Sequence, residues 1–180
     1  AFAALAAGVA GGGLRTVRAD YYRPPDPFAG TVAPPIVYVD QTGHHMEGVF
    51  AQFWHNAGGR WVLGFPITET LVEDGLRTQY FENFRLQYVP SARGDGDVRV
   101  TPLGRSLVPF PPAIEPPAAW PPFATFIAAK RADGLLGPAL SVPYWEGNTT
   151  VQWFQNAKLE GRRGRDGQAA VWAASLGAES

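Results

Sequence analysis

The chain has 180 residues, enough for one ordinary domain or two small ones. Hydrophobic residues make up 46% of it, so a core can form, whereas charged residues make up only 17% and the net charge is −1. This balance excludes the basic footprint of a nucleic-acid-binding protein, and the absence of cysteine excludes disulfides, thiolate zinc sites and a cysteine nucleophile.

The chain opens on a run of small apolar residues, AFAALAAGVAGGG, in which Phe2, Leu5 and Val9 are the larger side chains. The run is too short to span a bilayer, which takes roughly 20 residues, and it resembles the apolar core and small-residue end of a secretory signal peptide. We expect it to dock on its own domain or to insert into a neighbouring chain or a membrane. With the proline-rich lead that follows, it forms a predicted N-terminal region over residues 1–35.

The stretch DQTGHHMEGVF contains two of the three histidines, His44 and His45, between Asp40 and Glu47. A metal site is one interpretation, but adjacent histidines in a strand point to opposite faces, so both rarely bind one ion. The favoured interpretation is a turn before a helix, which a threonine and Gly43 at the bend support. We therefore predict no metal and no cofactor, with His44 and His45 as the alternative metal ligands.

A short helix and a small antiparallel sheet are predicted next. Gly48 to Ala57 carries apolar residues at helical spacing, and the glycines at 58 and 59 end the helix. The letters EDG at 73–75 signal a hairpin turn, and FRLQY at 84–88 alternates as a half-buried strand does. Phe81 falls on the other parity, which predicts a bulge or tight bend near Asn83.

Sliding the chain by 73 residues without gaps reveals an internal repeat. The pairs that match are FAQFW with FATFI, LG at 63–64 with LG at 136–137, QYFENFRL with QWFQNAKL, and LG at 103–104 with LG at 176–177. Because one unbroken register aligns motifs spread over nearly sixty residues, we interpret the chain as two copies of one module.

The predicted fold class is therefore α+β, with two tandem small modules, each a short helix packed on a small antiparallel sheet. The first copy spans about residues 36–107 and the second about residues 117–180. The proline-rich residues 108–116 between them favour an extended connector that fixes the spacing of the modules. One module has little core of its own, so pairing or stacking would stabilise it.

The first copy resembles the LGFP repeat of secreted bacterial cell-envelope proteins, in which a tryptophan precedes Gly-Gly, Leu-Gly-Phe-Pro and an aromatic-phenylalanine strand. The matching residues are Trp54, Gly58, Gly59, Leu63, Gly64, Phe65, Pro66, Tyr80 and Phe81. The second copy keeps Leu136 and Gly137 but lacks the Phe-Pro and Gly-Gly pairs. The resemblance implies export, a cell-surface location and a role in wall association, and it brings no catalytic residues.

Aromatic residues are abundant, with six Trp, six Tyr and eleven Phe. Exposed rings stack on sugars or on protein partners, and rings also fill cores where aliphatic residues are scarce. The candidates for partly exposed binding rings are Trp61, Tyr88, Trp120, Tyr144 and Trp145. They allow a protein partner or a cell-wall polysaccharide as the ligand.

A hydrolase with two carboxylates is the third hypothesis, built from Glu69, Glu73, Asp74 and Glu82. The second copy has Gln155 at the position of Glu82, and no catalytic motif occurs elsewhere. We therefore predict a non-enzymatic extracellular module that assembles with itself or with an envelope partner through its N-terminal segment. Binding of wall glycans by exposed rings is the alternative function.

Overall fold

The computed structural model of the chain describes residues 36–92 and 96–180. The described residues form four helices and three antiparallel sheets of two, four and four strands. This arrangement confirms the predicted α+β class. The predicted docking residues Phe2, Leu5 and Val9 lie outside the described residues.

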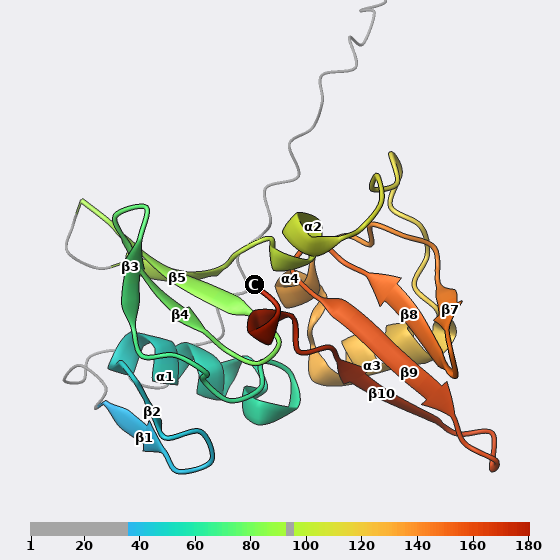
Figure 1. The fold of residues 1–180 in the computed structure, drawn as a ribbon, viewed down its shortest axis with the longest axis horizontal. Coiled ribbons are helices and arrows are strands. Elements are labelled where there is room, and N and C mark those ends of the chain that lie inside the picture. Colours follow the sequence, from blue (N-terminus) through green and yellow to red (C-terminus); the bar gives the residue numbers. More distant parts are fainter. Residues whose placement is uncertain (1–35, 93–95) are drawn as a thin grey trace, which may run out of the picture.

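Module one, residues 36–107, combines a hairpin, two helices and a four-stranded sheet in the order β3-β4-β5-β6 (Figure 1). Its elements are β1 (Val37–Val39), β2 (His44–Met46), α1 (Gly48–Asn56), the 3-10 turn η1 (Gly59–Trp61), β3 (Leu71–Glu73), β4 (Leu76–Tyr80), β5 (Arg85–Pro90), β6 (Gly96–Val100) and α2 (Leu103–Leu107). The predicted hairpin turn joins β3 to β4, where Asp74 and Gly75 both adopt positive φ angles. The predicted bend follows β4, since the Phe81 amide donates to the Phe84 carbonyl.

Module two, residues 117–180, repeats the order of a helix followed by a four-stranded sheet and a short last turn, and in the described residues it has no counterpart of the β1–β2 hairpin. Its elements are α3 (Pro121–Lys130), α4 (Asp133–Leu136), β7 (Tyr144–Glu146), β8 (Thr149–Trp153), β9 (Lys158–Arg163), β10 (Ala169–Ala173) and the 3-10 turn η2 (Leu176–Ala178). Each of its four strands begins and ends 73 residues after its counterpart in module one. The offset seen in the sequence is therefore also the offset of the strand register.

Buried polar side chains repeat with the same offset. Gln79 donates through its amide nitrogen to the carbonyl of Thr68, at 2.9 Å, and Gln152 donates to the carbonyl of Ser141, at 2.9 Å. The amide of Asn83 bonds the Val62 carbonyl at 2.9 Å, and Asn156 makes the equivalent bond to Leu135 at 2.7 Å. These side chains satisfy buried carbonyls that lie outside the strand ladders, which explains why both copies need an amide there.

The last turn of each module packs against the other module. Gly104 at the start of α2 packs against the bend after β8, and Gly177 in η2 packs against the bend after β4. The Gly177 backbone amide donates to the Glu82 carbonyl at 2.9 Å, and the Arg105 backbone amide donates to the Gln155 carbonyl at 2.9 Å. The C-terminal turn therefore lies against module one, and Figure 1 shows it beside the start of β5. This reciprocity is that of a two-fold dimer interface, here formed within one chain.

One core extends through both modules. Its largest fully buried side chains include Phe50, Phe81 and Phe84 of module one and Phe123 and Leu159 of module two. A second cluster forms where α2 and the connector cover the outer face of the sheet of module two, with Leu103, Leu107, Val108 and Phe110 contacting that module's side chains. The connector thus packs on module two. We had expected it to set the spacing between two separate modules, but the modules share one core.

Candidate functional site

A groove of about 630 Å³ lies where the two modules meet. Module one contributes η1 and the bend after β4, and module two contributes α3 and β10. The residues that line it are Arg60, Trp61, Glu82, Asn83, Pro122, Thr125, Phe126, Ala129, Lys130, Ala169, Val171, Trp172, Ala173 and Ser175. A groove of this size between two packed units is the usual place for a binding site.

Three aromatic rings face solvent or lie partly exposed along this groove. Trp61 is 63% exposed and Trp172 is 38% exposed, whereas Phe126 is half-buried against the core. Trp61 follows Gly58 and Gly59, whose positive φ angles turn the chain out of α1 into the 3-10 turn. The rings are held by short, packed elements, which keeps their positions fixed before any ligand arrives.

Two cationic side chains lie over the Trp61 ring. The Arg60 guanidinium carbon is 4.3 Å from the ring centroid, and the Lys130 Nζ approaches it from module two at 5.9 Å. Within residues 36–92 and 96–180, neither cation has a carboxylate within salt-bridge distance. The carboxylate that lines the groove, Glu82, is occupied because its Oε2 accepts the Phe65 amide at 2.9 Å. The two cations, Arg60 and Lys130, outnumber the one lining carboxylate, Glu82, so the groove has a net positive charge that a ligand carboxylate or phosphate would neutralise.

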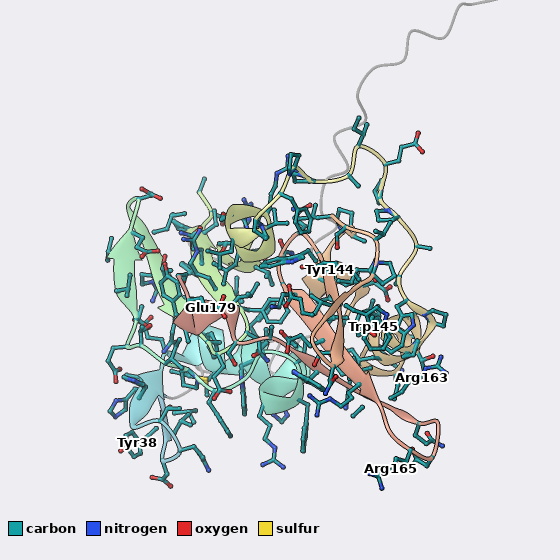
Figure 2. The ribbon with its side chains drawn as sticks, turned by 45° about the vertical axis from the view of Figure 1, so that its right-hand side comes forward. Tyr38, Tyr144, Trp145, Arg163, Arg165 and Glu179 are labelled. Atoms are coloured by element: carbon teal, nitrogen blue, oxygen red, sulfur yellow. The ribbon has the colours of Figure 1, made fainter. Side chains whose placement is uncertain are left out.

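The structure places one of the five predicted binding rings, Trp61, in the groove. Trp145 is 66% exposed and is not among the residues that line the groove; it lies on β7 next to Tyr144, and both are labelled in Figure 2. Tyr144 is half-buried, and its hydroxyl accepts the indole N–H of Trp153 at 2.8 Å. The predicted ring set is thus dispersed over the molecule.

The other two predicted rings are engaged in packing. Tyr88 is half-buried, and the guanidinium carbon of Arg77 lies 4.3 Å from its ring centroid. Trp120 is also half-buried and makes an edge contact with Phe123, with centroids 5.0 Å apart. Neither ring is among the residues that line the groove.

The sequence prediction missed Trp172, Phe126 and Lys130, which the groove brings together with Trp61. A signal for two of them lies in the repeat, because Trp172 stands where module one has Arg99 and Lys130 stands where it has Ala57. Trp61 likewise stands where module two has Gly134. Differences between the copies mark side chains that the shared fold does not require.

Both predicted histidines lie beside one carboxylate. The Nδ1 atoms of His44 and His45 are each 3.4 Å from Oε1 of Glu69, and the His45 amide also donates to Glu69 at 3.1 Å. That backbone hydrogen bond holds the pKa of the exposed Glu69 carboxyl below its usual range. Both rings reach one carboxylate because Glu69 lies beside the backbone amide of His45. Among the described residues, no group of three potential ligands is arranged to hold a metal ion.

The candidate hydrolase carboxylates have separate partners. Glu73 accepts the Tyr80 hydroxyl at 3.0 Å and lies 3.7 Å from Arg85, Glu82 accepts the Phe65 amide, and Glu69 binds the histidine pair. Asp74 is exposed in the β3–β4 turn. Three of the four carboxylates, those of Glu69, Glu73 and Glu82, thus hold local structure.

Comparison with known proteins gave no match, either among protein families or among curated proteins. The similarity to LGFP repeats therefore stays a prediction from the motif residues. In the part of the chain that the structure describes, no helix has the length and apolar character needed to cross a membrane.

Proposed function

We propose that the chain is a non-enzymatic cell-surface module that binds an extended, acidic partner in the groove between its two modules. The single observation that carries this proposal is the exposed Trp61 ring beneath two cations, Arg60 and Lys130, that have no carboxylate partner in the described residues. A tryptophan that is 63% exposed contributes little to the core, and burying it against a ligand is favourable.

The cell-surface location rests on the LGFP-like motif of module one and is part of the proposal. The predicted self-assembly through Phe2, Leu5 and Val9 depends on residues outside the described part, so it stays a prediction. The groove adds a second place for the predicted envelope partner, and either an acidic polypeptide or an acidic wall polysaccharide has the charge that it requires.

The test replaces the exposed tryptophans one at a time. We expect Trp61→Ala and Trp172→Ala each to weaken binding of immobilised acidic partners by about thirtyfold, since hot-spot rings contribute about 2 kcal/mol. The probes are polygalacturonate as the acidic polysaccharide and an array of acidic decapeptides, with binding followed by surface plasmon resonance. Trp145→Ala is the matched control, because that ring is equally exposed but lies outside the groove.

Salt dependence provides a second criterion. The double variant Arg60→Ala, Lys130→Ala is expected to bind as weakly at low salt as the wild-type chain binds at high salt. If neither probe class binds the wild-type chain, or if Trp145→Ala weakens binding as much as Trp61→Ala, the groove is not the binding site.

A further inference from the structure

We propose that the partner of this groove is a polypeptide that joins the sheet of module two as a fifth strand, along the free edge of β10. This inference rests on the proposed function, because it names the chemical class of the ligand in the same groove. In the sheet order β10-β9-β8-β7, strand β10 is outermost, and Figure 1 shows it at the lower margin of its sheet.

The register of β10 on β9 determines which of its backbone groups are free. The Ala174 amide donates to the Lys158 carbonyl at 2.8 Å, and the Gly164 amide donates to the Gln168 carbonyl at 2.7 Å. In an antiparallel pair such bonds recur at every second residue, so Ala170 and Trp172 also face β9. The N–H and C=O groups of the intervening residues, Ala169, Val171 and Ala173, therefore point away from β9. No other strand of the described residues pairs with them.

All three of these residues line the groove, as does Trp172. Ala169, Val171 and Ala173 all border it, together with Ser175 two positions further on. Ala173 is buried in the core and Val171 packs against it, so these side chains do not extend along the strand edge, where a further strand would lie about 4.8 Å away. A row of unpaired backbone groups in a groove is a template for strand addition, and a polysaccharide has no matching repeat of amide donors and carbonyl acceptors.

The side chains around the edge define the peptide. Side chains of an added strand alternate between the two faces of the sheet, so that one set meets Phe126 of α3 and the other meets Trp172. A carboxylate on the incoming strand would reach the uncompensated cations Arg60 and Lys130. The expected partner is an extended, apolar segment with β-branched or aromatic residues and one or more acidic residues, and without proline at the hydrogen-bonding positions.

Module one contains the same edge without the same surroundings. Strand β6 is the outermost strand of its sheet, and Val98 occupies the position of Val171. At the matched positions Trp172 is replaced by Arg99, Trp61 by Gly134 and Lys130 by Ala57. The β6 edge is therefore a control with an equivalent backbone, with Arg99 in place of the Trp172 ring and without counterparts of Trp61 and Lys130.

The experiment selects displayed random dodecapeptides on the full wild-type chain and then compares two edge variants. Val171→Pro removes an outward N–H and places a ring on the edge, without removing a hydrogen bond to β9. We expect it to weaken binding of the selected peptides by at least about tenfold, the loss of about one well-made set of strand contacts. Val98→Pro, the matched change on β6, is expected to leave binding within about twofold.

Amide hydrogen exchange on the wild-type chain gives a second readout that needs no variant. Bound peptide should slow exchange at Val171 and Ala173, whose amides face outward, and leave Ala170 and Trp172, already bonded to β9, unchanged. Retained binding by a folded Val171→Pro chain, or unchanged exchange at Val171, would overturn strand addition. If the chain binds polygalacturonate but selects no peptide, strand addition is overturned and the proposed function stands. If the chain binds neither polygalacturonate nor any peptide, both proposals are overturned.

Discussion

Module one and module two follow the same chain path, 73 residues apart, but they present different surfaces. What they share is buried: the phenylalanine of the first helix at 50 and 123, the amides at 79 and 152, and the glycines at 104 and 177. Several of the positions that differ are exposed or half-exposed, such as Trp61 against Gly134 and Trp172 against Arg99. The comparison separates side chains that the fold requires from side chains that are free to serve binding.

The outer faces of the two sheets differ as well. In module two, α2 and the connector cover that face and form a second apolar cluster around Val151 and Trp153. In module one, the matched positions are Thr78 and Tyr80, and the Tyr80 hydroxyl, Glu73 and Arg85 form a polar network there. The same strand geometry thus supports an apolar interface in one copy and a polar surface in the other.

The largest expected effect tests the reciprocal packing of the modules. A Cβ atom at Gly104 would overlap the carbonyl oxygen of Phe154, and one at Gly177 would overlap that of Phe81. Alanine normally favours a helix over glycine by about 1 kcal/mol, but here we expect Gly104→Ala and Gly177→Ala each to destabilise the chain by about 3 kcal/mol or more, because backbone atoms cannot move aside. Urea unfolding of the full chain measures the free energy.

Ser106→Ala, on the exposed side of α2, is the control and should change stability by less than about 0.5 kcal/mol. If the two modules are equivalent at their interface, both glycine variants lose similar stability. If only one of the two variants loses stability, the two last turns contribute unequally to the free energy of unfolding.

A smaller and unequal effect is expected at the buried glutamines. Gln152 makes three bonds, donating to the Ala118 and Ser141 carbonyls and accepting the Trp120 amide at 3.0 Å. Gln79 makes two, and its Oε1 has no hydrogen-bond partner in the described part of the chain. Methionine at either position leaves buried backbone groups unpaired, at a cost of about 2 kcal/mol at Gln79 and about 1 kcal/mol more at Gln152.

The measurement is again the free energy of unfolding, for Gln79→Met and Gln152→Met in the full chain. Equal losses would mean that the third bond of Gln152 contributes nothing. A larger loss at Gln79 would contradict the assignment of its unpaired oxygen, since removing that atom should relieve part of the cost.

The fold that the two modules share was predictable because it depends on the spacing of apolar and turn residues along the sequence. The sequence repeat has an offset of 73 residues, and every strand of the two four-stranded sheets has the same offset. The predicted turn EDG joins β3 to β4. Helix α1 begins at the predicted Gly48 and ends one residue before Ala57. These features depend on local spacing and on repetition, both of which can be read from one chain.

The groove was not predictable in the same way, because it forms only where the modules meet. Trp61 is in the predicted ring set, but its neighbours Phe126 and Trp172 come from more than sixty residues away and from another module. Abundance of aromatic residues gave no means to separate these from packed rings such as Trp120. The reciprocal exchange of α2 and η2, which brings the modules together, also left no trace in the spacing of either copy beyond the glycines at 104 and 177.

The smallest effect is expected for the two cations at matched positions, Arg85 on β5 and Lys158 on β9. Lys158 lies 3.0 Å from Glu160 and 3.6 Å from Glu146, whereas Arg85 lies 3.7 Å from Glu73. Burial lowers the pKa of the Lys158 amine, but its hydrogen bond to Glu160 and the surrounding carboxylates outweigh burial and raise the pKa above the ordinary 10.5. A raised folded-state pKa means that the stabilisation is complete below pH 10.5 and is lost as the pH rises through the folded value.

We therefore expect Lys158→Met to lose about 1 kcal/mol at pH 7, a value that allows for solvent screening of a partly exposed pair. The difference from wild type should shrink as the pH rises past the folded pKa of Lys158. Arg85→Met should show a difference that stays constant over the same range, because arginine remains charged. Burial is the first cause of the raised pKa of Tyr144 and is common to both chains, whereas the lowering of that pKa by Lys158 is lost in the variant. Urea unfolding from pH 7 to about pH 11 tests this, and a Lys158 difference that does not fall with pH would show that the amine acts through packing on Trp153 and not through its charge.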